Sequence, residues 1–219
     1  MIGKRNKIIC IIQARLNSKR LPKKVLVDIV GKTCLQRVIE RVQVSKLINE
    51  IWLATSFLKE DKILKETCDK LKIKFFQGSN LNVLSRFYQI LKITNAQSIV
   101  RITADCPLID AKVIDQAIKK FQKDKCDYLS NTVNRTFPDG LDVEIFSGVA
   151  LKRTYLEAKH PFLKEHVTPY IHGNVPKGIQ AGNFKTKQFI NEKDYSSIRI
   201  TLDRYEDLVL IRKIFFNLK

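Results

Sequence analysis

Five basic side chains fall within ten residues near the start of the chain, at Arg15, Lys19, Arg20, Lys23 and Lys24. They directly follow the apolar run 8–12, which is typical of a buried strand. Arginine can hold phosphate oxygens through paired donors, and lysine supplies a compact positive charge. Residues 14–24, the basic loop, are therefore predicted to bind a compact polyanion such as a triphosphate. The alternative is a solvated run of charge at the surface.

Two familiar nucleotide-binding motifs are absent from this position. No glycine occurs between Gly3 and Gly31, which excludes the G-x-G-x-x-G fingerprint of dinucleotide-binding folds. Gly31-Lys32-Thr33 resembles the end of a P-loop, but Leu26 stands where that motif needs its first glycine. The basic loop also lacks the aromatic residues that nucleic-acid modules place among their cations, so no nucleic-acid partner is expected.

An aspartate, Asp105, comes directly after the apolar run 98–103 and just before Pro107, which turns the chain away. Its carboxylate is therefore expected at the carboxyl end of a strand. Mg²⁺ takes one or two protein carboxylates together with phosphate oxygens, so this is a candidate metal position. The alternative is an aspartate that caps a helix or closes a turn.

Other charged residues are candidates for binding a second substrate. Asp142 and Glu144 alternate with apolar neighbours, which predicts a half-exposed strand over residues 141–145 whose two acids read an acceptor's hydroxyls or merely face solvent. Glu165 and His166 lie in an irregular segment that could close over an acceptor, although a lone histidine is more often structural. Arg86 opens a predicted helix and is expected to contact base or phosphate, or to lie at the surface.

The elements that position these residues alternate between short β-rich runs and amphipathic stripes, which predicts an α/β fold with a mostly parallel sheet. Strands are expected at residues 7–13, 50–55, 74–76 and 98–103, and helices at 33–44, 60–71 and 82–93. In such sheets ligands bind outside the carboxyl ends of the strands. The loops after Gln13, Thr55, Phe76 and Thr103 should therefore converge on one crevice.

The second half of the chain is less regular. It predicts helices at residues 112–122, 149–159 and 205–216, and strands near Tyr128 and at 198–201. No repeat interrupts the pattern, and 219 residues suit a single domain.

Composition limits the function classes. The net charge of +18 comes mostly from lysines spread through the helices, and 44% hydrophobic residues suffice for a sizeable core. Five scattered cysteines without a C-x-x-C pair exclude a zinc or thioredoxin site and suit a reducing cytoplasm. No window predicts a signal peptide or a membrane span, so the expected location is cytoplasmic.

Residues 11–26 resemble the nucleotide-binding signature of the cytidylyltransferase family, enzymes of the CMP-sugar synthetase type. Further motifs follow in the family's order, namely Ala54-Thr55-Ser56, Gly78-Ser79, Val83-Leu84-Ser85-Arg86, Val100-Arg101-Ile102-Thr103, Asp105-Cys106-Pro107-Leu108-Ile109-Asp110, Phe137-Pro138-Asp139-Gly140-Leu141-Asp142-Val143-Glu144, Glu165-His166-Val167-Thr168-Pro169-Tyr170, and Asp203 with Glu206-Asp207-Leu208. The chain departs from the family pattern at Asn17 and Ala104, where glycine is usual, and at Lys23, where a small residue is usual.

The resemblance implies a Rossmann-like three-layer nucleotidyltransferase fold and transfer of CMP from CTP to an acidic sugar or phosphorylated acceptor, in surface glycan synthesis. It implies a Mg²⁺ ion on Asp105 and Asp203, a homodimer, and catalytic roles for Arg15, Lys24 and Asp105. Implied nucleotide contacts are Gln13, Ala14, Arg15, Ser18, Lys19, Arg20, Lys24, Thr55, Arg86 and Asp105. Implied acceptor contacts are Asp142, Glu144, Glu165 and His166.

Two other functions compete with this one. A glycosyltransferase would use a similar nucleotide crevice, but such enzymes commonly hold their metal with a D-x-D pair, and Asp105-Cys106-Pro107 breaks that pattern. A non-catalytic basic binding protein is supported only by the net charge.

Overall fold

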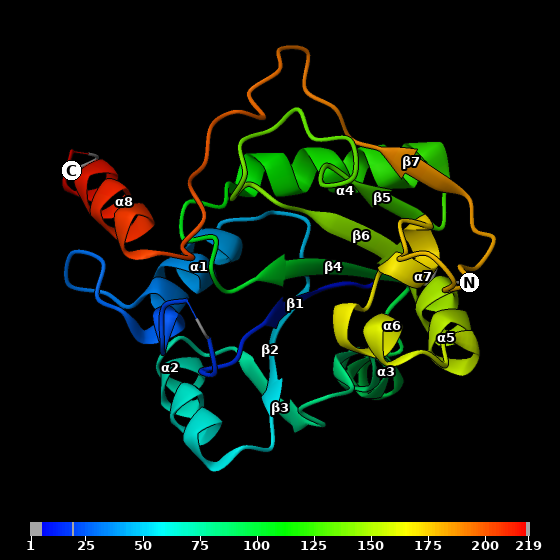
Figure 1. Cartoon of the computed structure of the whole chain (residues 1–219), viewed down its shortest axis with the longest axis horizontal. Helices are drawn as coiled ribbons and strands as arrows, with labels where there is room; N and C mark the ends of the chain where they lie inside the picture. Colours follow the sequence, from blue (N-terminus) through cyan, green and yellow to red (C-terminus); the bar gives the residue numbers. More distant parts are fainter. Residues whose placement is uncertain (1–5, 19, 218–219) are drawn as a thin grey trace.

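A seven-stranded sheet forms the centre of the computed structural model, which describes residues 6–18 and 20–217 (Figure 1). Its strand order is β3-β2-β1-β4-β6-β5-β7. The strands are β1 (Ile8–Gln13), β2 (Glu50–Ser56), β3 (Lys74–Gly78), β4 (Ser98–Thr103), β5 (Tyr128–Ser130), β6 (Glu144–Ser147) and β7 (Thr186–Gln188). Only β6 runs against its neighbours, β4 and β5, while the other pairings in this sheet are parallel.

Helices cover both faces of the sheet. The α-helices are α1 (Cys34–Gln43), α2 (Leu64–Lys70), α3 (Val83–Thr94), α4 (Ala111–Asp124), α5 (Gly148–Glu157), α6 (Pro161–His166), α7 (Pro169–His172) and α8 (Tyr205–Asn217), with 3₁₀ turns η1 (Lys24–Leu26) and η2 (Lys59–Ile63). None of the helices in residues 6–18 and 20–217 has the length and apolar character needed to cross a membrane.

The sequence of β1 is apolar without interruption because the strand lies in the middle of the sheet. Successive side chains of a strand point to opposite faces, and both faces here are buried. Cys10 and Ile12 pack among residues of α1, α2 and α4, whereas Ile9 and Ile11 pack among residues of α3, α5, α6 and α7. A strand covered on both faces cannot alternate with polar residues. The predicted α/β fold of three layers with a mostly parallel sheet is thus confirmed.

The last helix, α8, packs beside the start of α1 rather than on the main sheet (Figure 1). Leu208 and Ile211 bury against Ile29, Cys34 and Leu202. The chain between β7 and α8 crosses the molecule to reach this place, and it brings residues 199–207 alongside the loop that follows β4.

The N-terminus of α4 is capped by Asp110 and not by Asp105. The carboxylate of Asp110 accepts hydrogen bonds from the backbone N–H groups of Lys112 and Val113, at 2.6 and 3.3 Å, and so caps the helix. The possibility that Asp105 is a capping residue is therefore wrong, and its side chain is available to the loops around it.

Several expected elements differ from the structure. The strand predicted at 198–201 is wrong, because that segment has only an isolated bridge between Arg199 and Asp139. The half-exposed strand at 141–145 is also wrong: β6 begins at Glu144, and its first three residues are buried. The predicted helix 60–71 begins as η2, and the irregular proline-rich segment contains α6, α7 and the unpredicted β7.

Candidate active site

A crevice of about 730 Å³ lies at the carboxyl ends of β1 and β4. The predicted site residues that line it are Gln13, Ala14, Arg15, Ser18, Arg20, Lys24, Arg86, Asp105, Glu165, His166 and Asp203. Lys19 lies outside the described residues. The loops after β1 and β4 converge here as expected, whereas the loops after β2 and β3 do not line the crevice, and Arg86 reaches it from α3.

The ammonium group of Lys24 joins two carboxylates from opposite parts of the chain. Its Nζ lies 2.5 Å from Asp105 Oδ2 and 2.7 Å from Asp203 Oδ1. Burial lowers the pKa of Lys24, but the charges and hydrogen bonds of the two aspartates outweigh this and raise it overall. Burial raises the pKa of Asp203, but hydrogen bonds from Lys24 and Arg199 lower it overall. Lys24 and Asp203 are therefore both charged at neutral pH.

Backbone hydrogen bonds bring the two aspartates together. The carbonyl of Asp105 accepts from the N–H of Leu202 at 2.8 Å and from the hydroxyl of Thr201 at 3.2 Å. The carboxylate of Asp207 accepts from the N–H groups of Asp203 and Arg204, at 2.8 and 2.9 Å, and closes the turn into α8. This turn aims the Asp203 side chain at the crevice, so the predicted pair is assembled although its members are far apart in sequence.

The basic loop is closed on itself at Leu16, whose side chain is buried. The carbonyl of Leu16 accepts hydrogen bonds from the N–H groups of Ser18 and Lys23, at 2.9 and 3.1 Å. Lys23 takes the left-handed conformation, with φ of 55°. Left-handed backbone costs a side-chain-bearing residue roughly 1–2 kcal/mol, which explains why a small residue suits this position. The closed loop is followed directly by η1, so the closure fixes the backbone position of Lys24.

Two further cations flank Lys24 on the crevice side. Arg20 pairs with Asp203 at 2.9 Å, and Arg15 lies 3.5 Å from Glu165 at the end of α6. About half of each arginine side chain is exposed. These exposed pairs contribute little to stability, so both guanidinium groups are able to turn toward an anion in the crevice.

Arg86 is not at the surface, and that alternative is wrong. The side chain is only 1% exposed, and the guanidinium donates to the carbonyls of Ser79 and Asn80 at 2.7 and 3.1 Å. Burial lowers its pKa to about 10; the nearby charge of Asp61 opposes this shift, and that of Arg15 adds to it. Arg86 thus holds the loop after β3 and presents part of its side chain to the crevice.

Thr55 lies outside the crevice and is fully buried, so its expected nucleotide contact is not supported. Its hydroxyl donates instead to Asp61 at 2.9 Å. Sequence reasoning missed Asp61, because an acid in the first turn of a predicted helix is normally unremarkable. The signal that would find it is its burial, which only the folded chain reveals.

A second pocket of about 330 Å³ adjoins the crevice, and Thr103 and His166 line both. Asp142 lines this pocket and pairs with both nitrogens of the Arg135 guanidinium, at 2.6 and 3.0 Å. Its expected place on one strand face with Glu144 is wrong, because Asp142 precedes β6.

Glu144 also borders the second pocket but is only 6% exposed. Its carboxylate forms an ion pair with Arg101 and accepts a 2.7 Å hydrogen bond from the hydroxyl of Tyr128. Burial raises the pKa of Glu144, but Arg101 and the hydrogen bonds lower it overall. Glu144 therefore orients Arg101 and is not an exposed reader of hydroxyl groups.

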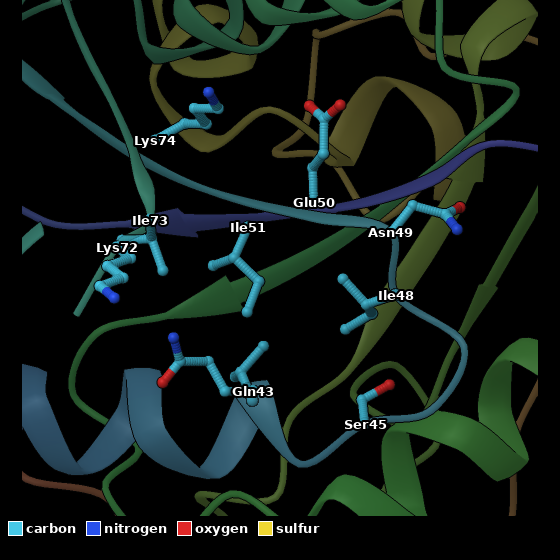
Figure 2. Close-up of a pocket in the computed structure, with 10 residues that line it drawn as sticks. Gln43, Ser45, Ile48, Asn49, Glu50, Ile51, Lys72, Ile73 and Lys74 are labelled. Carbon is cyan, nitrogen blue, oxygen red and sulfur yellow. The ribbon is translucent and has the colours of Figure 1, made fainter.

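A third hollow, of about 310 Å³, lies near the start of β2 and β3 (Figure 2). Several of its polar groups are used within the protein. Ser45 donates to Asp115 at 2.5 Å, Gln43 donates to the carbonyl of Leu71, and Glu50 pairs with Lys7. This hollow is at the amino ends of the strands, away from the charged crevice.

Comparison with known proteins agrees with this geometry. A family model described as cytidylyltransferase matches residues 9–216. The spore coat polysaccharide biosynthesis protein SpsF of Bacillus subtilis is 29% identical over 215 residues, which are 96% of this chain and 87% of that protein. The 3-deoxy-manno-octulosonate cytidylyltransferase of Solibacter usitatus is 30% identical over 139 residues, which are 63% of this chain and 53% of that protein.

A solved structure supports the same assignment over nearly the full length. The cytidylyltransferase from Leptospira borgpetersenii superposes with a TM-score of 0.85 at 30% identity, and the match covers 97% of this chain and 94% of that one. The motifs noted in the sequence, the three-layer fold and these comparisons agree. The chain belongs to the cytidylyltransferase family.

Proposed function

We propose that the chain transfers CMP from CTP to an acidic sugar or a phosphorylated acceptor, releases pyrophosphate, and serves glycan synthesis. The observation that carries this proposal is the assembly in one crevice of Arg15, Arg20 and Lys24 with the carboxylates of Asp105 and Asp203. A triphosphate needs both parts, because cations must balance its charge and carboxylates must hold its metal.

The two aspartates suit a Mg²⁺ ion. Mg²⁺ is usually held by one or two carboxylates together with substrate phosphates and water. The described residues contain no cluster of three or more metal-ligating side chains, which agrees with a site completed by the substrate. Oxygens of Asp105 and Asp203 already share one cation, the ammonium of Lys24. When bound, Mg²⁺ would neutralise charge that develops on the α-phosphate.

In this proposal the acceptor oxygen bonds to the α-phosphorus while the bond from that phosphorus to the β-phosphate oxygen breaks. Arg15, Arg20 and Lys24 lower the barrier by stabilising the negative charge on the departing pyrophosphate. Lys24 leaves its two aspartates and turns to the phosphates, and Arg86 holds the wall against which the nucleotide lies. Most of the rate increase would come from positioning and charge neutralisation, because no covalent intermediate is needed.

The acceptor is assigned to the second pocket, since this pocket opens beside the crevice and shares Thr103 and His166 with it. His166 stands at the end of α6 and lines both spaces, so in this proposal it touches both substrates, while Glu165 lines only the crevice. Asp142 lines the pocket with its charge balanced by Arg135. We infer that Asp142 reads hydroxyl groups of the acceptor.

Thermal stabilisation by each of the four nucleoside triphosphates with Mg²⁺ tests the proposal without a known acceptor. A ligand at a hundredfold excess over its Kd stabilises by about 2.7 kcal/mol. We expect CTP to give the largest rise in Tm, and the rise to shrink when EDTA removes the metal. Equal shifts with all four nucleotides, or a shift with RNA alone, would refute it. Pyrophosphate release with a panel of acidic sugars and sugar phosphates then identifies the acceptor.

A homodimer and a cytoplasmic location, both expected at the outset, stay predictions. Helix α5 exposes Val149 and Leu156, which are 77% and 54% accessible. Analytical ultracentrifugation of the purified chain measures the oligomeric state directly.

A further inference from the structure

We infer that Asp61, a carboxylate outside the crevice, is the positioning residue that holds the basic loop in its phosphate-binding shape. The effect on CTP binding rests on the function proposed above, whereas the effect on the loop does not. The inference adds a residue from η2 to a site whose other members lie on the loops after β1 and β4, on α3 and on residues 165, 166 and 203.

Asp61 is fully buried, and its two oxygens accept four hydrogen bonds. Oδ1 accepts from the N–H of Leu16 at 3.0 Å. Oδ2 accepts from the hydroxyl of Thr55 at 2.9 Å and from the N–H and hydroxyl of Ser56 at 3.2 and 2.5 Å. All four hydrogen-bond donors are uncharged, and the positive charge of Arg86 nearby adds to the stabilisation of the buried carboxylate.

One of these bonds reaches the basic loop at its third residue, Leu16. Leu16 donates its N–H to Asp61 and accepts with its carbonyl from Ser18 and Lys23, the bonds that close the loop. The peptide groups of Leu16 therefore link the end of β2 to both arms of the loop. Arg15 and Asn17, its neighbours, both line the crevice.

Few other backbone hydrogen bonds join the described residues of this loop to the rest of the fold. Its first residue, Ala14, donates to the carbonyl of Ala54 at 3.2 Å, and the loop then continues without regular structure as far as η1. Without Asp61, the N–H of Leu16 would be buried and unpaired, a state that costs about 1–3 kcal/mol. The loop would avoid this cost by shifting, and the backbone positions of Arg15 and Lys24 would then no longer be fixed.

Asp61→Asn keeps the size of the side chain but replaces one acceptor oxygen with an NH₂ group that faces donors. The matched control is Asp115→Asn. Asp115 likewise accepts from a serine hydroxyl, Ser45 at 2.5 Å, and from a backbone N–H, Lys46 at 3.0 Å, but at the far end of the sheet. The control thus carries the same chemical change away from the crevice.

Limited trypsin digestion tests the loop itself, because Arg15, Arg20 and Lys23 are cleavage points within it. We expect Asp61→Asn to raise the rate of cleavage at these three points about tenfold, with no nucleotide present, and Asp115→Asn to leave it unchanged. Mass spectrometry identifies the cut sites. Cleavage in the loop that rises no more than cleavage elsewhere in the chain would overturn the inference.

CTP binding tests the functional part. We expect Asp61→Asn to raise the Kd and KM for CTP about tenfold, while the KM for the acceptor stays unchanged. A merely structural role would lower the total activity in proportion to the folded fraction and would not change the KM for CTP alone. A loosened loop with wild-type CTP affinity would overturn the inference. If the wild-type chain itself does not bind CTP, the proposed function fails and the digestion result alone decides the role of Asp61.

Thr55→Val provides a milder variant if Asp61→Asn does not fold. It removes one hydroxyl donor from Asp61 and keeps the volume of the side chain. We expect about threefold faster cleavage in the loop and a matching rise in the KM for CTP. Wild-type values for both measurements in this variant would overturn the inference.

Discussion

Two groups of charged residues lie at the same end of the sheet and differ in how they are held. In the crevice, Lys24 pairs with Asp105 and Asp203, and the carboxylates come from loops. Beside the second pocket, Arg101 pairs with Glu144, and both residues lie on paired strands, β4 and β6. The Asp105 side chain is 23% exposed, whereas that of Glu144 is 8% exposed.

This difference separates charges that can change partners from charges that belong to the fold. Water or a substrate can replace Lys24 at the crevice aspartates, because the pair is open to solvent on one side. Arg101 and Glu144 cannot part without leaving a buried charge unpaired, which is strongly unfavourable. Charged side chains at the same edge of one sheet are therefore accessible to a ligand in the first group and enclosed by the fold in the second.

The sharpest test of this comparison is Asp105→Asn. Loss of a carboxylate that is proposed to hold the metal should lower kcat/KM about a thousandfold. The free energy of unfolding should change by only about 1 kcal/mol, because Lys24 keeps its ion pair with Asp203. Pyrophosphate release and urea denaturation measure the two quantities. Asp110→Asn is the control, since asparagine caps α4 as well as aspartate does. Near-normal turnover would remove Asp105 from the catalytic residues.

Glu144→Gln should give the opposite result. It leaves Arg101 without its buried carboxylate, so we expect the free energy of unfolding to fall by about 3 kcal/mol, as measured in urea. The control is Glu50→Gln, which breaks a pair with Lys7 whose two side chains are each about one-third exposed and should cost less than about 1 kcal/mol. Equal costs for the two variants would show that Glu144 is not architectural.

The smallest effect is expected from His172, which lines the second pocket and packs at a tilt against Tyr128, with ring centroids 5.6 Å apart. Burial lowers the pKa of His172; Glu144 opposes this shift and Arg101 adds to it. The unfolded chain therefore binds the proton more tightly, and stability should fall as pH drops below about 6.5, the unfolded value. His172→Gln should show a weaker loss than the wild type in urea denaturation between about pH 5.5 and 7.5. If the free energy of unfolding depends on pH equally in the variant and the wild type, the prediction is refuted.

Much of the first half of the fold was predictable, because each element there carries its own pattern. The strand expected at 98–103 matches β4 at both ends, and the helix expected at 33–44 contains α1, with Thr33 and Gln36 forming a capping box. In the second half the strands are short and pair across long connections. Residues 198–201 show β-rich composition but find no strand partner, while β7, with the unremarkable sequence Thr-Lys-Gln, pairs with β5.

The part of the candidate site that could be predicted is the part in which residue type alone indicates the chemistry. Five cations after a buried strand and an aspartate at the end of another suffice to indicate a site for a charged phosphate ligand. The structure brings Arg15, Arg20 and Lys24 together with Asp105 in the crevice, whereas Lys23 does not line it and Lys19 lies outside the described residues. The burial of Thr55 and Arg86 was not predictable, since threonine and arginine are found mostly at surfaces. Their burial follows from hydrogen-bond partners, Asp61 and the carbonyls after β3, that pattern and spacing do not reveal.

The sequence by itself determined the alternation of strands and helices, the place of the basic loop and the identity of the chemical groups, because these depend on local patterns and on side-chain type. Only the tertiary structure decided which carboxylates meet. Asp105 and Asp203 face one ammonium because Leu202 bonds to the carbonyl of Asp105, whereas Glu144 is enclosed between strands. Burial and pairing arise from contacts between distant segments, and these contacts decide whether a charge can serve a substrate or only the fold.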